Sequence, residues 1–327
     1  MAEGRSIKTV GLLSSGGDAP GMNPCIRAVV RAGLARGMQL IGIEDGFEGL
    51  IHGRFHPMGP RDVGGILQRG GTILQTARCK DFMEPKYQME AIRAIHDAAI
   101  DGLVVIGGDG SLQGAQKLVE RGIAVVGVPA SIDNDIFGTD MCIGVDTALN
   151  TIVDAIDKLR DTASSHNRAF LVETMGRESG YLAMQAGIVT GAELVLVPEV
   201  ETDVELVGQV MEAAYRRGKS HCIVVVAEGA KPPINELAEM INSMELGFST
   251  RVTILGHIQR GGKPSAFDRL LASRFGTKAV EYLVEGKTGV MTGLVGSTVE
   301  AVPFSHVFSQ RKSLPMDQYE MAKILAR

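Results

Sequence analysis

Short apolar runs recur along the chain, and each is followed by a turn of glycine, proline, serine or acidic residues. Because the apolar character continues without polar alternation, both faces of each run are expected to be covered, as in a parallel sheet. Six runs predict buried strands: Val10–Leu13, Leu103–Ile106, Ala124–Val128, Phe170–Val172, Leu194–Val197 and Ile223–Val226.

Between these runs, apolar residues return at helical spacing. Five segments predict helices: Pro24–Arg36, Ser111–Arg121, Gly144–Arg160, Val204–Arg217 and Ala266–Val284. A repeated strand–turn–helix order is typical of an α/β fold with largely parallel sheets. Ligands of such sheets bind outside the carboxyl ends of the strands, so the turns after the apolar runs are the candidate functional segments.

Composition narrows the class of protein. The chain has 327 residues, enough for about two domains, with 45% hydrophobic and 22% charged residues, which excludes intrinsic disorder. Its 33 basic and 38 acidic residues give a net charge of −5 and argue against nucleic-acid or membrane-surface binding through net charge. Glycine is unusually frequent, with 41 residues, and these fall mainly in the turns after the apolar runs.

The cysteines and the apolar runs indicate the compartment. Cys25, Cys79, Cys142 and Cys222 are far apart in sequence and form no C-x-x-C pair, which predicts reduced thiols rather than a zinc site or a disulfide framework. We see neither an apolar run long enough for a membrane helix nor a signal peptide at the N-terminus. The expected location is cytoplasmic.

Two of the turns have the composition of a phosphate site. In the segment Ser14–Pro24, glycines allow close backbone approach, and Asn23-Pro24 predicts a helix cap and first helical residue. The turn Gly107–Ser111 also opens a helix, and Asp109 within it is a candidate oxygen ligand for Mg²⁺. For either turn alone, a tight strand-to-helix connection explains the glycines equally well.

A third turn, Pro129–Asp135, carries two carboxylates two residues apart, Asp133 and Asp135. They would repel each other unless a metal or a cationic site shares the space. One carboxylate could take the proton of a hydroxyl while the other faces the Mg²⁺ region. The alternative is an Asx-rich surface turn.

The second half of the chain supplies cations that suit a phosphate monoester, several of them in glycine-rich contexts: Arg160, Arg168, Arg177, Arg251, His257 and Arg260. Any one of them could instead be a solvated surface residue. Gly218-Lys219-Ser220 and Gly286-Lys287-Thr288 lack the earlier glycine of a Walker A loop and follow no predicted strand. The residues thus predict a Mg²⁺-dependent phosphoryl transferase with a phosphorylated acceptor.

Five motifs, in order, resemble the bacterial type of the ATP-dependent 6-phosphofructokinase family from about residue 7 to about residue 300. They are Ser15–Asn23, Gly71-Thr72 to Ala77-Arg78, Gly107–Ser111, Ile132–Asp135 and Gly256–Gly262. The resemblance implies a two-lobed α/β fold in which each lobe is a largely parallel sheet sandwiched by helices. Residues 1–144 and about 259–309 would form the ATP-binding lobe, and residues 145–258 and about 310–327 the sugar-phosphate lobe.

The resemblance also implies a reaction, the glycolytic transfer of the ATP γ-phosphoryl group to the 1-hydroxyl of fructose 6-phosphate. Asp133 matches the general base, Asp109 the Mg²⁺ ligand and Arg177 the side chain that neutralises transition-state charge; Gly17, Arg78 and Ser131 complete the catalytic set. The matches around ATP are Gly17, Arg78, Cys79, Gly107, Gly108, Asp109, Gly110, Ser111 and Gly114. The matches around the sugar phosphate are Ser131, Asp133, Arg168, Met175, Gly176, Arg177, Glu228, Arg251, His257 and Arg260.

The resemblance also implies an allosteric homotetramer, in which Arg168 and Arg251 would come from a neighbouring subunit. A second anion site, for ADP or phosphoenolpyruvate, is matched by Arg27, Arg31, Arg160, Glu193, Arg217, Lys219 and His221. Here the chain departs from the family, because Pro60 stands at a usual arginine position, with Arg61 next to it. The stretch Gly144-Val145-Asp146-Thr147 also replaces a more apolar stretch of many bacterial members, with no consequence that the sequence assigns to Asp146.

Two other functions stay open at this point. Pyrophosphate-dependent relatives share the scaffold, but they place Asp where this chain has Gly110 and tend to place Lys at Ala130, so ATP is the expected donor. A catalytically silent sugar-phosphate sensor is the other alternative, and the joint presence of Asp133, Asp109 and Arg177 counts against it.

Overall fold

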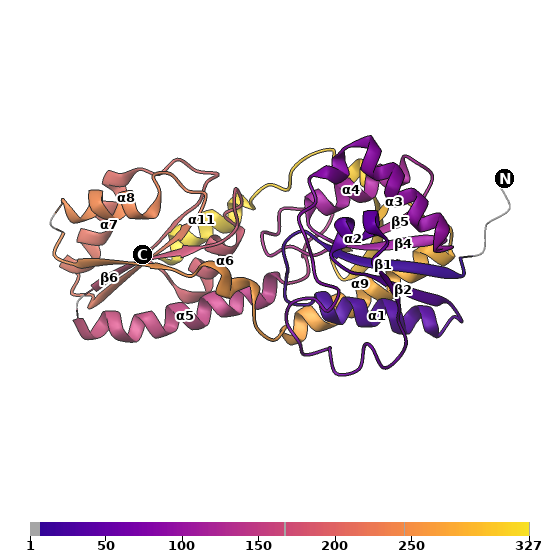
Figure 1. Cartoon of the computed structure of the whole chain (residues 1–327). Helices are drawn as coiled ribbons and strands as arrows, with labels where there is room; N and C mark the ends of the chain where they lie inside the picture. Colours follow the sequence, from indigo (N-terminus) through magenta and orange to yellow (C-terminus); the bar gives the residue numbers. More distant parts are fainter. Residues whose placement is uncertain (1–6, 167, 245, 327) are drawn as a thin grey trace. The chain divides into compact units, whose positions relative to one another are not determined.

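The computed structural model describes residues 7–166, 168–244 and 246–326. The chain forms two compact units (Figure 1). Unit 1 comprises Met1–Ser131, Asp135–Asp146 and Arg260–Lys312, and unit 2 comprises Ile132–Asn134, Thr147–Gln259 and Ser313–Arg327. The short segment Ile132–Asn134 belongs to unit 2, so Ser131 and Asp133 stand in different units although they are two residues apart in sequence.

Unit 1 is built on a seven-stranded sheet with the order β11-β10-β5-β4-β1-β2-β3. Its strands are β1 (Thr9–Ser15), β2 (Gln39–Ile43), β3 (Phe55–Pro57), β4 (Gly102–Gly107), β5 (Ala124–Pro129), β10 (Val290–Val295) and β11 (Thr298–Pro303). The five inner strands are parallel, and the edge strands β3 and β11 pair antiparallel. β1 and β4 are buried along their whole length, as their unbroken apolar runs predict.

Helices cover both faces of this sheet (Figure 1). They are α1 (Met22–Leu34), α2 (Gly46–His52), α3 (Pro85–Asp97), α4 (Asp109–Val119), α9 (Ala266–Val284) and α10 (Phe304–Val307), with a 3₁₀ turn η1 (Asp81–Met83). α1 and α9 lie against each other on one face. Gly276 permits their close approach, because a Cβ at this position would lie 2.7 Å from the carbonyl oxygen of Cys25.

Unit 2 is built on a four-stranded parallel sheet with the order β7-β8-β6-β9. Its strands are β6 (Arg168–Thr174), β7 (Leu194–Leu196), β8 (His221–Ala227) and β9 (Ser249–Ile254). Its helices are α5 (Val145–His166), which starts in unit 1, α6 (Tyr181–Thr190), α7 (Val204–Arg216), α8 (Ile234–Asn242) and α11 (Met316–Leu325), with a 3₁₀ turn η2 (Gly256–Arg260). Leu171, Met211, Val224 and Leu237 are fully buried in its core.

All six predicted strands and all five predicted helices are confirmed, with ends displaced by a few residues. The parallel α/β class is confirmed as well. β2, β3, β9, β10 and β11 were not predicted; polar residues such as Arg251 in β9 and Thr292 in β10 interrupt their apolar character. Within the described residues, no helix is long and apolar enough to span a membrane. No disulfide joins the four cysteines, and Cys25, Cys142 and Cys222 are buried.

The predicted helix cap at Asn23 is wrong. α1 begins at Met22, and its N-cap is Gly21, with a φ of 120°. A side chain at Gly21 would be strained, and its Cβ would lie 2.5 Å from the Cγ2 of Ile143. Glycine therefore starts the helix, and the Asn23 side chain is used elsewhere.

Candidate active site

The three predicted turns lie side by side at one edge of the unit 1 sheet. β1, β4 and β5 are neighbours in the sheet, and their last residues are in register, with Ser15 beside Gly107 and Gly107 beside Pro129. Gly107 has no room for a side chain, since a Cβ would lie 2.5 Å from the Ser15 carbonyl oxygen and 2.6 Å from the Ser111 Oγ. The backbones of the first two turns therefore approach closely at the carboxyl edge, where α/β sheets bind ligands.

The N-terminus of α4 opens from this edge. Its N-cap is Gly108, and among the described residues no side chain caps it. The carbonyl oxygen of Gly108 accepts from the amides of Ser111 and Leu112, at 3.0 and 3.1 Å. A Cβ at Gly110 would have no neighbouring atom within 4 Å, so the N-terminal helical turn of α4 faces open space. A helix N-terminus of this kind offers free amides and a positive dipole end to a phosphate group.

Asp109 is the first residue of α4 and is exposed. Burial, followed by the negative charge of Asp135, raises the pKa of its carboxyl group. The Nε2 of Gln113 donates to its Oδ2 at 2.6 Å. Asp135 of the third turn thus stands within electrostatic reach of Asp109, and a cation between the two carboxylates would relieve their repulsion.

The described residues contain no group of three or more His, Cys, Asp and Glu side chains that could hold a metal by themselves. Mg²⁺ with a nucleotide needs only one or two carboxylates, because water and phosphate oxygens supply the other ligands. Asp109 and Asp135, both oxygen donors, fit this requirement.

Asn23 fastens a loop onto the first turn. It is 1% exposed, and its Nδ2 donates to the carbonyl oxygens of Arg69 and Gly70, both at 3.1 Å. Its Oδ1 accepts from the amide of Ile73 at 2.7 Å. The side chain that was predicted to cap α1 instead holds the glycine-rich segment 69–73.

The same loop is held further along by hydroxyl groups. The Oγ of Ser14 and the Oγ1 of Thr72 are 2.7 Å apart, and the Oγ1 of Thr76 donates to the carbonyl oxygen of Gly16 at 2.8 Å. Arg78 follows two residues later and is exposed. These contacts anchor the backbone just before Arg78 to the first turn.

Cys79 and Gly114 lie around an aromatic pair. The rings of Phe47 and Phe82 stack with centroids 4.2 Å apart, and a Cβ at Gly114 would lie 2.8 Å from the Phe47 ring. Burial and Glu48 raise the pKa of the Cys79 thiol to about 11, so it stays protonated near neutral pH.

Arg260, predicted for the sugar phosphate, lies against the first turn in unit 1. Its Nη1 donates to the carbonyl oxygen of Asp18 at 3.1 Å, and a Cβ at Gly17 would lie 2.6 Å from that nitrogen. Glycine at position 17 therefore makes room for the guanidinium. Ser131, at the end of unit 1, lies beside Gly108, whose Cβ position is 3.8 Å from the Ser131 Cβ.

Unit 2 brings Asp133 and Arg177 together. Asp133 is 4% exposed, and its Oδ2 lies 3.6 Å from the Nε of the more exposed Arg177. Two left-handed residues shape the turns that carry them, Asn134 with a φ of 51° and Arg177 itself with a φ of 53°. The acidic pair of the third turn is thus divided, with Asp133 beside a cation and Asp135 near the carboxylate of Asp109.

Glu228 holds the backbone of the arginine turn. Its Oε1 accepts from the amides of Gly176 and Arg177, at 3.0 and 2.6 Å. Its charge, after the larger effect of burial, also raises the pKa of Glu173 on β6.

Sequence reasoning missed Gln259, which is fully buried. Its Oε1 accepts from the amide of Met175 at 3.1 Å, and its Nε2 donates to the carbonyl oxygen of Gly256 at 3.0 Å. It thereby joins the Met175 turn to the start of η2, which carries His257. Its position between His257 and Arg260 in the last motif was the available signal.

Arg168 and Arg251 are not brought to this end of the sheet. Arg168 begins β6 and Met175 follows its last residue, so about 20 Å separates them at the usual rise per residue. Arg251 on β9 pairs with Phe170 of β6, near the same starting end as Arg168. Within one chain, neither arginine lies with Glu228 and Arg177.

The predicted effector residues are divided between the units. Arg27 and Arg31 lie on α1, where the Nη2 of Arg31 donates to the carbonyl oxygen of Pro60 at 3.1 Å. The other five belong to unit 2: Arg160, Glu193, Arg217, Lys219 and His221.

Among the unit 2 effector residues, Glu193 and Lys219 contact each other, and Arg160 lies nearby at the end of α6. Buried Glu193 accepts from the Nζ of Lys219 at 2.9 Å and from the amide of Ile223 at 2.7 Å. The Nη2 of Arg160 donates to the carbonyl oxygen of Thr190. These contacts form a polar cluster around the C-terminus of α6.

The family model and two similar proteins that match this chain all carry the name phosphofructokinase. The phosphofructokinase family model matches residues 9–283. ATP-dependent 6-phosphofructokinase of Thermotoga neapolitana is 50% identical over 321 residues, which cover 98% of this chain and 100% of the relative. ATP-dependent 6-phosphofructokinase 1 of Thermus thermophilus is 50% identical over 323 residues, which cover 98% of this chain.

Solved structures agree with these relatives. Phosphofructokinase from Saccharomyces cerevisiae is 35% identical with a TM-score of 0.87, over 96% of this chain and 50% of the yeast chain. A pyrophosphate-dependent phosphofructokinase from Marinobacter aquaeolei has a TM-score of 0.84 at 22% identity, over 95% of this chain and 86% of that chain, and shares the fold. With this fold and this extent of identity, the chain belongs to the phosphofructokinase family.

Proposed function

We propose that the protein transfers the γ-phosphoryl group of ATP to the 1-hydroxyl of fructose 6-phosphate, giving fructose 1,6-bisphosphate and ADP. The observation that carries this function is the identity of about half of the residues, over 98% of the chain, to relatives named ATP-dependent 6-phosphofructokinase. In this proposal unit 2 supplies the groups that act on the sugar-phosphate acceptor, and unit 1 supplies the groups that bind the phosphoryl donor.

Unit 2 supplies the acceptor chemistry in this proposal. The 1-hydroxyl oxygen forms a bond to the γ-phosphorus, the bond from that phosphorus to the β–γ bridging oxygen breaks, and ADP leaves with the electron pair. Asp133 takes the hydroxyl proton. Arg177, 3.6 Å from Asp133, balances charge on the transferring group. Glu228 and Gln259 hold the backbone turns of Arg177, Met175 and His257 around the sugar phosphate.

Unit 1 supplies the donor chemistry. The N-terminus of α4, with Gly107, Gly108, Gly110 and Ser111, receives the phosphates of ATP. Arg78 adds positive charge, and Arg260, proposed to bind the sugar phosphate, lies against Gly17 of the first turn. Asp109 would hold Mg²⁺ with help from Asp135. When bound, the ion would neutralise charge on the β- and γ-phosphate oxygens.

Pyrophosphate as the donor is the second candidate, and the structural likeness to pyrophosphate-dependent enzymes at 21–22% identity extends to the fold alone. The open space at Gly110 favours ATP, because an α-phosphate and ribose can pass close to the backbone there. A silent sensor is disfavoured by the full set of acid, base and cationic groups.

We infer that the enzyme is a homotetramer whose sugar-phosphate site takes Arg168 and Arg251 from a neighbouring subunit. The support is that Arg168 lies at the start of β6, about 20 Å from the Met175 turn, and that Arg251 on β9 pairs near the same end of β6. Arg251→Ala should weaken fructose 6-phosphate binding by a few kcal/mol. Hybrids reassembled from Arg251→Ala and Asp133→Asn subunits should regain part of the activity, and complete absence of rescue would indicate a site built within one chain.

We propose that a site between neighbouring subunits binds ADP or phosphoenolpyruvate as an effector, through Arg27, Arg31, Arg160, Glu193, Arg217, Lys219 and His221. Pro60 stands where the family usually has an arginine, with Arg61 next to it, and the carbonyl oxygen of Pro60 accepts a hydrogen bond from Arg31. A cytoplasmic location accords with these substrates and with the absence of disulfides among the described residues.

The proposed function is tested with purified enzyme and fructose 6-phosphate in a coupled assay, with ATP or pyrophosphate and with or without Mg²⁺. Turnover should require Mg²⁺ and ATP together. No turnover with any combination would identify a sensor instead of an enzyme.

A further inference from the structure

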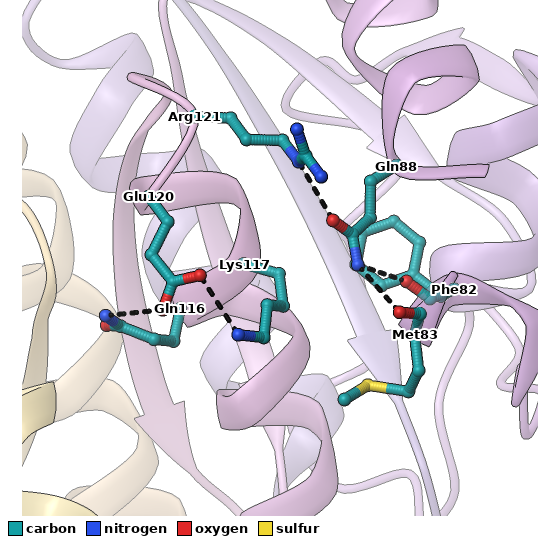
Figure 2. A network of polar contacts seen from close by, with 7 residues as sticks. All are labelled: Phe82, Met83, Gln88, Gln116, Lys117, Glu120 and Arg121. Carbon is teal, nitrogen blue, oxygen red and sulfur yellow. Dashed lines mark hydrogen bonds and ion pairs between the residues drawn. The ribbon is translucent and has the colours of Figure 1, made fainter. Parts of the chain in front are cut away.

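A buried glutamine outside all the predicted motifs joins three segments of unit 1 (Figure 2). Gln88 lies on α3 and is 2% exposed. Its Nε2 donates to the carbonyl oxygens of Phe82 and Met83, the last two residues of η1, at 2.9 and 3.2 Å. Its Oε1 accepts from the Nε of Arg121, just beyond the end of α4, at 2.9 Å.

These partners define the orientation of the amide. The two hydrogens of a glutamine amide are both used, and its oxygen faces a guanidinium, which can only donate. The reverse orientation would set the Gln88 oxygen against two carbonyl oxygens and its amino group against Arg121. An apolar residue here would leave the carbonyl groups of buried Phe82 and half-exposed Met83 without this donor, and the loss at the buried carbonyl group is substantial.

The backbone that Gln88 holds is the far end of the segment that begins at Arg78 and Cys79. Phe82 is 1% exposed, and its ring stacks on Phe47. The side chain of Phe82 is thus fixed by stacking and its carbonyl group by Gln88. With Thr76 bound to the carbonyl oxygen of Gly16 at the near end, the segment between residues 76 and 83 is held at both ends.

Other polar pairs on α4 differ from this one. The Nζ of Lys117 lies 3.0 Å from the Oε2 of Glu120, but both side chains are exposed, at 38% and 46% (Figure 2). Exposed pairs of this kind contribute little to stability and constrain no loop. Lys117 therefore provides a control one turn of helix away from Arg121.

We propose that Gln88, oriented by Arg121, is a positioning residue for the nucleotide: it fixes η1 and thereby the segment Arg78–Met83. This inference rests on the proposed function, which assigns Arg78 and Cys79 to the ATP site. Gln88 acts through the loop and touches no reacting atom, so its loss changes nucleotide affinity more than the chemical step.

The test compares Gln88→Met, Arg121→Met and Lys117→Ala in the full-length enzyme. Gln88→Met should raise the KM for ATP about tenfold, the scale of one to two lost hydrogen bonds, while the KM for fructose 6-phosphate at saturating ATP stays within about twofold. Arg121→Met should raise the KM for ATP about threefold, and Lys117→Ala should leave both constants unchanged. A purely structural role predicts equal changes in both KM values alongside a lower melting temperature, and that result overturns the proposal.

Hydrogen exchange separates this proposal from the proposed function. The amides of residues 79–84 should exchange faster in Gln88→Met and Arg121→Met than in Lys117→Ala, whichever phosphoryl donor the enzyme uses. Unchanged exchange in this segment overturns the positioning role even when ATP is the donor. Should Gln88→Met fail to fold, Arg121→Met gives the same two readouts, and unchanged values there reject the proposal.

Discussion

The Nε of Arg177 lies 3.6 Å from the Oδ2 of Asp133, a carboxylate that is almost fully buried within unit 2. Asp135, two residues further along the chain, belongs to unit 1 and influences Asp109 instead. Asn134, in the left-handed conformation, stands between the two aspartates. One short turn therefore supplies an acidic group to each unit.

The pairing with Arg177 makes Asp133 the proposed base. Asp133→Asn keeps the shape of the side chain and removes its ability to take a proton, so kcat should fall by about 10²–10⁴. The KM for fructose 6-phosphate should change much less, since the lost interaction belongs to the transition state. Steady-state kinetics checks this, and a near-normal kcat in the folded variant would assign the base elsewhere.

Asp109 links activity to pH-dependent stability. Its raised pKa means that the folded protein binds this proton more tightly than the unfolded chain does. Its contribution to stability is therefore full below the ordinary pKa of 3.8 and is lost as the pH rises through the raised folded value. At neutral pH the ionised carboxyl group of Asp109 therefore lowers the free energy of unfolding of the enzyme without nucleotide.

Asp109→Asn should accordingly raise the melting temperature of the free enzyme at pH 7, by an amount that shrinks as the pH is lowered toward 4. Turnover should fall about 10²–10³-fold, because a ligand for the ion on the phosphates is lost. Thermal unfolding from pH 4 to 8, without nucleotide, is the measurement. A variant less stable than the parent at pH 7 would contradict the assigned cause of the shift.

Gly110 provides a test of donor recognition in which size and charge can be separated. A side chain there meets nothing within 4 Å, so Gly110→Asp and Gly110→Asn should both fold. The Asp variant should lose about 10²–10³ more in kcat/KM for ATP than the Asn variant, through repulsion between like charges in a partly desolvated site. Equal losses in the two variants would mean that bulk, rather than charge, governs the position.

Arg217 and Arg216 are adjacent, and they offer a matched pair for the effector proposal. Arg216 lies 2.6 Å from Glu212 in an exposed ion pair, at the end of α7. Arg217→Ala should reduce the response of the kinetics to ADP or phosphoenolpyruvate, with kcat nearly unchanged, whereas Arg216→Ala should not. If neither ligand alters the kinetics of the unaltered enzyme, Pro60 has disabled the site.

The buried parallel strands were predictable because a strand covered on both faces needs continuous apolar residues. Such runs end at the turns of Gly107 and Asp133, so the turns of the proposed site could be located from the sequence as well. β9 was missed because Arg251 and two threonines interrupt its apolar pattern. Edge strands of this kind bury less surface, which weakens the signal.

The side-chain hydrogen bonds that anchor the loops could not be predicted from local sequence. The hydrogen-bond partners of Asn23 lie between 46 and 50 positions further along the sequence. The local signal of an Asn before Pro instead favours a helix cap. Gln88 lies in none of the motifs, and Gln259 lies in the last motif without its contacts being evident there, since both roles depend on which backbone groups the fold brings near. These contacts need the tertiary structure.

The central claim is the phosphoryl donor and acceptor pair. One mixture of enzyme, Mg²⁺, fructose 6-phosphate and equal concentrations of ATP and pyrophosphate, followed by phosphorus NMR, compares both donors directly. We predict loss of the γ-phosphate signal of ATP, matched by ADP and a new phosphate ester at C1 of the sugar, while pyrophosphate persists. Consumption of pyrophosphate ahead of ATP, or no new sugar phosphate ester, would contradict the account.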